Sequence, residues 1–378
     1  MQKLTKTVNL ESRKERDPRG TRNMSQEEIY ERLANYLDNL PGGFPRTESG
    51  VETRILKRLF TEDEAVLTCS LRMMPEPVER IAKRVNLPTT ELADRLYEMS
   101  RKGLIYRADL PEGPRYMAVQ YVVGIWEYHV NDLDEDLIRD MNEYIPSLID
   151  TTSKLKTHQL RTIPIGASLD GQGVVMPYEQ ARELIEQQSK IVVAPCICRK
   201  EHSMIGQSCG KLVEACLIFS SAAYFYENNG LGRSISREEA MQILEKAEAE
   251  ALVLQPTNAQ KIHSICLCCG DCCQILKSLK RLPKPASLVH ANYYISIRKE
   301  DCIGCETCVE RCQMEAIRVQ DGIAKVNLDY CIGCGLCVTT CSGDAIDLIR
   351  KEEKDCYTPP ANVVETYMRI AQERGLIK

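Results

Sequence analysis

Two cysteine runs near the C-terminal end constrain the fold of this chain more than any other feature. Both have the spacing C-x2-C-x2-C-x3-C, and the second begins 29 residues after the first. Their members are Cys302, Cys305, Cys308 and Cys312 in the first run, and Cys331, Cys334, Cys337 and Cys341 in the second. Three thiolates on one tight turn, with a fourth from elsewhere, form the ligand pattern of a cubane iron–sulfur cluster. The duplicated spacing therefore predicts two 4Fe-4S clusters.

The residues around these cysteines repeat as well, as DCIGCETCVERCQMEAI and YCIGCGLCVTTCSGDAI. A turn at Asp321–Gly322 separates two β-rich runs, and YYISI and IDLIR can pair as outer strands. On these features, residues 294–350 resemble a bacterial dicluster ferredoxin, in which the fourth cysteine of each run ligates the other cluster. The resemblance implies one cluster on Cys302, Cys305, Cys308 and Cys341, and a second on Cys331, Cys334, Cys337 and Cys312. We place this ferredoxin-like α+β domain at residues 291–352.

Two positions depart from the ferredoxin pattern. The family usually has a proline after the fourth cysteine of each run, whereas this chain has Gln313 and Ser342 there. Because proline is not a ligand, we expect both clusters to be kept, with altered loop stiffness and potential. Zinc is the alternative metal, since a C-x2-C pair alone is common in zinc sites. The duplicated four-thiol runs favour iron–sulfur clusters over zinc.

Nine further cysteines lie in two groups in the middle of the chain, at spacings that match no motif we can assign. The candidates for at least one additional iron–sulfur cluster are Cys196, Cys198, Cys209 and Cys216, followed by Cys266, Cys269, Cys272 and Cys273. Zinc, a redox-active disulfide and buried unligated thiols are the alternatives. Helix and strand patterns alternate over residues 160–290, which predicts a small α/β domain. Both groups follow apolar strands, so we expect them to meet at the carboxyl ends of those strands.

Basic side chains and histidines accompany the middle cysteines. Arg199, Lys200 and Lys211 are placed to offset the negative charge of a cluster held by thiolates. His202 and His263 are near enough in sequence to act as ligands. A solvated surface position is nevertheless the expected state of each histidine.

The first 195 residues contain a single cysteine and make a metal-poor half. Residues 1–23 are charged and aperiodic, which predicts a mobile tail. Residues 24–123 combine short amphipathic helices with a hairpin around PEGP and resemble a winged helix-turn-helix domain. We expect linker helices at residues 124–159 and a C-terminal helix at residues 353–378.

The charge of the would-be recognition helix bears on what the winged-helix-like part binds. Three acidic residues stand beside three basic ones, namely Glu91, Asp94 and Glu98 beside Arg95, Arg101 and Lys102. Phosphate binding requires a clear basic excess. The sequence therefore favours protein docking or a structural role over nucleic-acid binding.

The remaining features limit where the protein is expected to be located and which functions it can have. The net charge is −5, and neither an apolar leader nor a run of about 18 apolar residues is present, so we expect a cytoplasmic protein without a membrane span. No dinucleotide, P-loop or nucleophile-elbow motif appears, so no catalytic residue is nominated. The whole chain resembles winged-helix/ferredoxin iron–sulfur proteins of anaerobic bacteria and archaea, which implies electron transfer with redox partner proteins.

We therefore expect a multi-domain α+β protein that acts as the electron-relay subunit of a cytosolic anaerobic redox complex. Single electrons would pass through the two 4Fe-4S clusters and one more cluster in the middle domain. Such a chain is an electron carrier or oxidoreductase subunit rather than a stand-alone enzyme. The alternatives are a redox-sensing winged-helix regulator and an oxidoreductase with its site at the middle cysteines. Nothing in the sequence indicates an oligomeric state.

Overall fold

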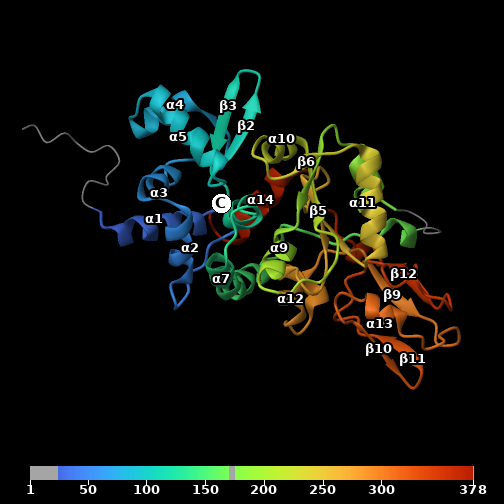
Figure 1. Cartoon of the computed structure of the whole chain (residues 1–378). Helices are drawn as coiled ribbons and strands as arrows, with labels where there is room; N and C mark the ends of the chain where they lie inside the picture. Colours follow the sequence, from blue (N-terminus) through green and yellow to red (C-terminus); the bar gives the residue numbers. More distant parts are fainter. Residues whose placement is uncertain (1–23, 170–174, 378) are drawn as a thin grey trace, which may run out of the picture.

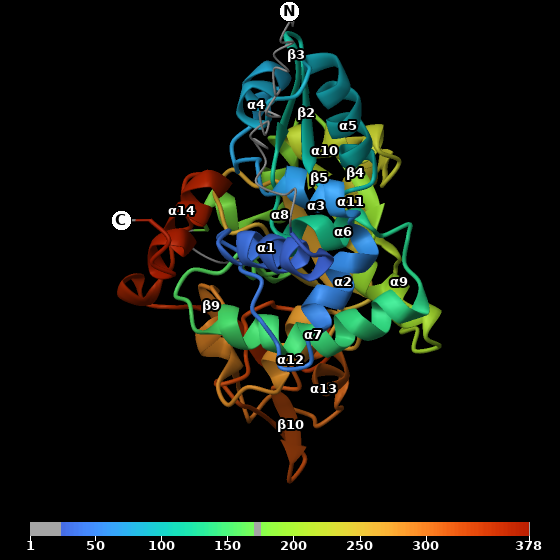
Figure 2. The same cartoon turned by 90° about the vertical axis from the view of Figure 1, so that its left-hand side faces the viewer.

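The computed structural model describes residues 24–169 and 175–377, in which helices are combined with antiparallel sheets (Figures 1 and 2). The mixed helix and sheet composition predicted from the sequence is confirmed. The predicted mobile tail at residues 1–23 lies outside the described residues. Within the described ranges, no helix is both long and apolar enough to cross a membrane.

The N-terminal part consists of five helices and a small antiparallel sheet of strand order β1-β3-β2. Its elements are α1 (Gln26–Asp38), α2 (Val51–Leu59), α3 (Glu62–Thr68), β1 (Glu76–Pro77), α4 (Val78–Val85), α5 (Thr89–Arg101), β2 (Tyr106–Leu110) and β3 (Gly113–Met117). Helix α1 begins at a capping box formed by Ser25 and Glu28, and α3 begins at another formed by Thr61 and Glu64. The predicted hairpin around PEGP is confirmed as β2 and β3. The winged-helix identity of this part stays a prediction.

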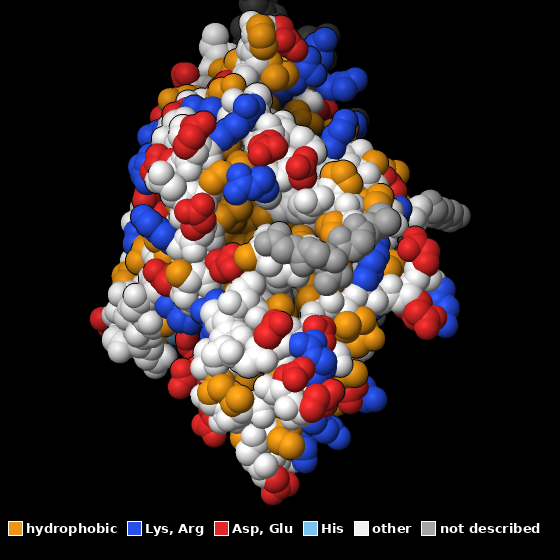
Figure 3. Space-filling model, turned by 90° about the vertical axis from the view of Figure 1, so that its right-hand side faces the viewer, with side chains coloured by type: hydrophobic (Ala, Val, Ile, Leu, Met, Phe, Trp, Pro, Cys, Tyr) orange, Lys and Arg blue, Asp and Glu red, His pale blue; other side chains and the backbone are white. Residues whose placement is uncertain are grey.

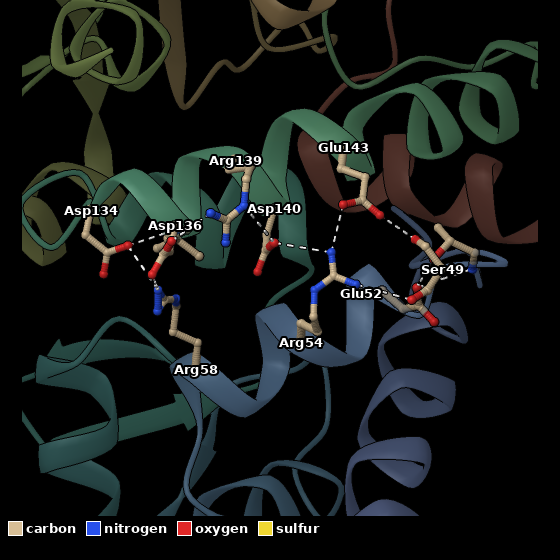
Figure 4. Close-up of polar contacts among 11 residues, drawn as sticks. Ser49, Glu52, Arg54, Arg58, Asp134, Asp136, Arg139, Asp140 and Glu143 are labelled. Atoms are coloured by element: carbon tan, nitrogen blue, oxygen red, sulfur yellow. Dashed lines mark hydrogen bonds and ion pairs between the residues drawn. The ribbon is translucent and has the colours of Figure 1, made fainter.

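The predicted linker contains a long helix that packs on the N-terminal core. The elements are α6 (Trp126–Tyr128) and α7 (Glu135–Ser153). Leu137 and Tyr144 of α7 are fully buried in the core that also includes α1 and α2. Figure 4 shows the polar contacts between α2 and α7, where Arg54 lies 2.7 Å from the Glu143 carboxylate and 3.3 Å from the Asp140 carboxylate. Surface ion pairs contribute about 0–1 kcal/mol each, so burial of the apolar face is what mainly holds α7 in place.

A five-stranded sheet of order β6-β4-β5-β8-β7 forms the middle of the molecule. Its strands are β4 (Ile191–Pro195), β5 (Glu214–Phe219), β6 (Arg233–Ser234), β7 (Val253–Pro256) and β8 (Ser264–Cys268). Helices and strands alternate as predicted, but every strand pair is antiparallel, so the expected α/β sheet with its carboxyl strand ends on one edge is wrong. A parallel pair needs a crossover that carries the chain back across the sheet. The connection through α9 (Ile197–Met204) instead turns the chain at one end of the sheet.

The two faces of this sheet belong to different cores, because alternate side chains of a strand point to opposite faces. Val192 and Ala194 join the N-terminal core, whereas Val193 and Leu217 join a second core with α8 and α11. The remaining helices of this part are α8 (Ala181–Glu186), α10 (Ser220–Asn228), α11 (Arg237–Ala249) and α12 (Gln274–Lys280). The N-terminal and middle parts therefore share one apolar core.

The ferredoxin-like part lies at one end of the molecule, in orange in Figure 1, and its β10–β11 hairpin points away from the rest. Its elements are β9 (Tyr293–Ile297), α13 (Thr307–Arg311), β10 (Ile317–Gln320), β11 (Ile323–Val326) and β12 (Ile346–Arg350). Strands β10 and β11 pair around the predicted turn, and β9 pairs with β12. Both strand pairings expected from the sequence are confirmed.

The C-terminal helix α14 (Val363–Glu373) runs back to the N-terminal part. The Glu373 carboxylate accepts a hydrogen bond from the Lys156 backbone N–H at 2.8 Å. Beyond the helix, Arg374 donates to the Leu40 carbonyl at 2.6 Å. These contacts hold the C-terminal end of the described chain against the N-terminal part and the segment after α7.

Candidate metal centres

The eight ferredoxin cysteines surround two separate hollows of similar size. One hollow, of about 20 Å³, has in its wall Cys302, Cys305, Cys308 and Cys341. The other, also of about 20 Å³, has in its wall Cys312, Cys331, Cys334 and Cys337. Each hollow thus brings three thiols of one run together with the fourth thiol of the other run, which is the arrangement that the resemblance implied.

Glycine lets the backbone bend closely around both hollows. Gly304 and Gly333 have φ angles of 68° and 64°, a region that side chains rarely allow. A Cβ added to Gly333 would lie 2.1 Å from the Tyr293 carbonyl oxygen, and one added to Gly304 would lie 2.4 Å from the Gly322 carbonyl oxygen. Larger residues at either position would push the cysteine loop away from the strand behind it.

Backbone N–H groups point at the sulfur atoms of these hollows. The pairs are Ala324 N to Cys302 Sγ at 3.3 Å, Ala316 N to Cys312 Sγ at 3.2 Å, and Ala345 N to Cys341 Sγ at 3.3 Å. Hydrogen bonds to a thiolate stabilise its charged form and help to set the potential of a cluster. Four convergent thiols with directed N–H donors fit a 4Fe-4S cluster in each hollow.

The two hollows differ in exposure. Cys305 in the first is exposed, and its neighbour Ile303 is 67% exposed. Ile332 beside the second is buried in the core of the middle part. Burial raises the pKa of Cys334 to about 12, whereas the Thr307 hydroxyl lowers the pKa of Cys305. The first hollow therefore faces solvent, and the second faces the interior.

Seven of the nine middle cysteines line one interior cavity, namely Cys196, Cys198, Cys216, Cys266, Cys268, Cys269 and Cys273. The sheet creates this wall: Cys216 of β5 lies directly opposite Cys266 of β8. Cys268 follows two residues later and therefore points to the same face of the strand. Cys273 is the N-cap residue of α12, and Cys198 lies in the first turn of α9. Two helix starts and two strands thus place thiols around one space.

The other two middle cysteines join the same site through Cys269. The sulfur atoms of Cys209, Cys269 and Cys272 all lie within 4.8 Å of one another. The Cys209 and Cys269 sulfurs are 3.9 Å apart. Since Cys269 also lines the cavity, the nine thiols form one continuous group, which we call the middle thiol site.

The structure brings all eight predicted middle residues together, but in different groups. Cys209 lies with two members of the second predicted set, and Cys216 pairs with Cys266, so the set of Cys196, Cys198, Cys209 and Cys216 does not stand alone. Cys268 was missed by the sequence analysis. Its spacing of two from Cys266, on a strand, was the signal that could have found it.

Basic side chains lie against the middle thiol site, as predicted. Arg199 is buried and donates to the Leu212 and Leu267 carbonyls at 2.7 and 2.8 Å. Burial opposes its charge, but the thiolates of Cys196 and Cys269 outweigh burial and raise the pKa of Arg199. Lys200 and Lys211 line a small surface hollow together with Cys209.

The two histidines considered as possible ligands lie in different surroundings. His202 is buried, not solvated as expected; its Nδ1 lies 2.8 Å from the Cys198 carbonyl oxygen and its Nε2 lies 2.8 Å from Lys277 Nζ. Both ring nitrogens therefore have partners other than sulfur. His263 is exposed, as expected.

A direct contact joins the middle thiol site to the second hollow. The Gly270 backbone N–H donates to Gln313 Oε1 at 2.7 Å. A Cβ added to Gly270 would lie 2.2 Å from the Gln313 carbonyl oxygen, so the two backbones touch. Gly270 follows Cys269, and Gln313 follows Cys312 in place of the proline usual in bacterial ferredoxins. The departure from the family pattern thus lies at the junction of the two sites.

One carboxyl group faces the middle thiol site across the cavity. Glu127 of α6 lines the cavity, and its carboxylate accepts a hydrogen bond from the Gly124 N–H at 2.7 Å. Burial raises the pKa of Glu127 to about 8. No ion pair neutralises this carboxyl among the residues that the structure describes.

Comparison with known proteins bears on the C-terminal part. Residues 295–348 match the family described as a 4Fe-4S dicluster domain. Neither a search of curated proteins nor a search of solved structures found a match to this chain. The matched segment contains both cysteine runs and strands β10 and β11, and it overlaps most of β9 and β12. Residues 295–348 of this chain are therefore a 4Fe-4S dicluster domain of the ferredoxin type.

Proposed function

We propose that this chain is an electron-transfer protein in which the dicluster domain exchanges single electrons with a third iron–sulfur centre at the middle thiol site. The observation that carries the proposal is the contact between Gly270 and Gln313. Through it, a cysteine loop of the middle thiol site touches a cysteine loop of the dicluster domain. When bound, 4Fe-4S clusters accept and donate single electrons over a potential range that the protein environment sets.

In this proposal the two hollows hold the clusters in the way that the ferredoxin resemblance implies. The outer set is Cys302, Cys305, Cys308 and Cys341, and the inner set is Cys312, Cys331, Cys334 and Cys337. The exposed Cys305 and Ile303 make the outer set the place where a redox partner protein docks. The inner set, none of whose cysteines is exposed, then lies between the partner and the middle thiol site. This order supports a directional path from the surface to the interior.

The middle thiol site would hold at least one further cluster, because it offers more thiols than a single metal ion can use. A tetrahedral zinc site takes four ligands, whereas nine cysteines converge here. Arg199 is well placed to offset the negative charge that thiolates and a cluster bring. A reducing cytoplasmic setting suits such a set of thiols.

The N-terminal part is proposed to be a winged-helix-like module with a structural or partner-docking role. Arg101, at the end of α5, donates to the Asn228 backbone oxygen of α10, and Asn229 donates to the Ser100 carbonyl at 3.2 Å. The helix that a DNA-binding relative would use is therefore partly occupied by the middle part. Figure 3 shows the other side of the molecule, that of α11 and the dicluster part, where acidic and basic side chains are mixed. The contacts between α5 and the end of α10 disfavour the regulator alternative.

The relay can be tested with a cysteine variant and a matched control on anaerobically purified protein. Cys269→Ser removes the thiol shared by the two groups of the middle thiol site. Cys69→Ser is the control, since Cys69 is a half-buried free thiol that packs on the N-terminal core. We expect the Cys269 variant to lose the iron of the middle thiol site and keep about eight irons for the two ferredoxin clusters.

Electron paramagnetic resonance gives a second readout on the same samples. In the reduced native protein, the inner ferredoxin cluster should show magnetic interaction with the middle centre, and this interaction should vanish in the Cys269 variant. Equal iron content and equal spectra in the Cys269 and Cys69 variants would rule the relay out.

A further inference from the structure

The cavity at the middle thiol site is much larger than a cluster needs. Its volume is about 190 Å³, against about 20 Å³ for each of the two hollows that suit one 4Fe-4S cluster. The space is therefore almost ten times that of a four-cysteine hollow. A single cluster on the cysteine wall leaves room for another molecule.

The wall opposite the cysteines is apolar and comes from distant parts of the chain. Leu148 and Ile149 of α7 line it together with Leu279 of α12 and Ile370 of α14. All four side chains are buried with respect to the outside of the protein. Binding sites for small organic molecules are typically concave, mostly apolar and built where separate parts of a fold meet. This wall has those properties.

The polar groups in the cavity indicate an uncharged ligand. The only acidic residue among the described lining residues is Glu127, fixed by the Gly124 N–H. The only Lys or Arg among them is Arg199, which already binds two backbone carbonyls and lies against thiolates. Gln159 is also engaged, since its Nε2 donates to the Val122 carbonyl at 2.9 Å. No free cation is therefore left among these residues to neutralise an anion, while the Glu127 carboxyl can hydrogen bond a neutral carbonyl or hydroxyl.

We propose that this cavity binds an uncharged, largely apolar organic carbonyl compound of the quinone class, which the chain reduces beside the middle thiol site. The proposal rests on the electron path proposed above. Two electrons from a one-electron donor reach the quinone one at a time, and two protons from water complete its two O–H bonds. The donor is oxidised and the quinone becomes a hydroquinone. Glu127 positions the ligand through a hydrogen bond to one of its oxygens.

The test uses duroquinone, an uncharged quinone with no unsubstituted ring carbon for thiols to attack. Equilibrium dialysis of the oxidised, cluster-containing protein measures binding without any turnover. Thr152→Trp fills the cavity from α7, because Thr152 lines it. Arg139→Trp is the matched control, since Arg139 lies on the same helix with a side chain that is 69% exposed. We expect saturable binding to the native protein and to the control, and at least about tenfold weaker binding to the Thr152 variant, because the indole ring takes the space of the ligand; tenfold corresponds to about 1.4 kcal/mol.

A second variant guards against a folding defect in the first. Glu127→Leu removes the proposed hydrogen bond without adding bulk, and it should also weaken duroquinone binding while iron content stays at the native value. In native protein reduced with dithionite, duroquinone should reoxidise the clusters faster than in either cavity variant. Faster reoxidation confined to the native protein and the Arg139 control supports reduction inside the cavity rather than at the exposed outer cluster.

Three results would overturn the proposal. The first is that the native protein shows no saturable binding of duroquinone. The second is that a Thr152 variant with native iron content binds duroquinone as tightly as the native protein. The third is about sixteen irons per chain with no bound duroquinone, which would mean that clusters fill the cavity. Failure of the electron path has a different signature, since it appears as about eight irons per chain and is measured independently of dialysis.

Discussion

Replacing Gly270 with alanine tests the junction between the dicluster domain and the middle thiol site. The new Cβ would lie 2.2 Å from the Gln313 carbonyl oxygen, and such contacts essentially never fall below 3.0 Å, so the two backbones must separate by at least 0.8 Å (3.0 − 2.2). Overpacking of this kind costs about 1–3 kcal/mol. The buried hydrogen bond from the Gly270 N–H to Gln313, 2.7 Å long, adds about 1 kcal/mol if it is lost.

The expected total is thus about 2–4 kcal/mol, which corresponds to a Tm lower by roughly 4–16 °C for a unit of 150–250 residues. The assay is anaerobic differential scanning calorimetry of the cluster-containing protein, with the reduced-state resonance spectrum recorded on the same sample. Gly166→Ala is the matched control, because nothing lies within 4 Å of a Cβ there and its φ is not positive. The control should stay within about 0.5 kcal/mol of the native protein. If the Gly270 variant melts with the control and keeps the native magnetic interaction, the reasoning about the junction is wrong.

Three further perturbations have defined outcomes. Cys308→Ser should remove about four irons from the outer hollow only, and Cys337→Ser should remove about four from the inner hollow only, as measured by metal analysis. Loss of all eight irons from either variant would contradict two separate sites. Burial raises the pKa of Glu127 from 4.5 to about 8, so the native state keeps a proton that the unfolded chain releases, and stability falls as pH rises through this window. Glu127→Gln should therefore gain Tm relative to the native protein between pH 5 and pH 8, and parallel Tm curves would refute this. Glu179 is buried and lies 2.7 Å from Arg350, so Glu179→Ala should destabilise by about 3–5 kcal/mol in calorimetry, and an unchanged Tm would show that this pair is not needed.

The dicluster domain could be predicted closely because most of its ligands and its hairpin turn are specified by residues near one another in the sequence. Three ligands of each cluster lie within seven residues, and the turn at Asp321–Gly322 sets the hairpin between the runs. The fourth ligand of each set came from the ferredoxin resemblance, and the two hollows have that arrangement. The strand pair β9 and β12 was predicted from the runs YYISI and IDLIR, which flank the two cysteine runs.

The middle part could be predicted only in outline because its contacts are not local. Cys209 and Cys269 are 60 residues apart in sequence, and their sulfurs meet only after β5 and β8 pair. Alternating helices and strands are typical of parallel sheets, which is why the strand direction was wrong. The cavity was not foreseeable either, since its apolar wall is assembled from α7, α12 and α14.

The contact at Gln313 explains structurally why this chain departs from the ferredoxin pattern at that position. From the sequence alone, the missing proline implied only altered loop stiffness and cluster potential. In the fold, Gln313 is buried and its side chain accepts the Gly270 N–H, a bond that proline could not make. Proline would also leave that buried N–H without its partner.

The central claim, a third iron–sulfur centre in electronic contact with the dicluster domain, is tested most directly by iron and acid-labile sulfide per chain. The measurement is made on anaerobically purified protein, together with the resonance spectrum of the dithionite-reduced sample. We predict about twelve or more irons with matching sulfide, and a spectrum in which the centres interact. About eight irons, with the middle thiol site holding zinc or no metal, would contradict the claim.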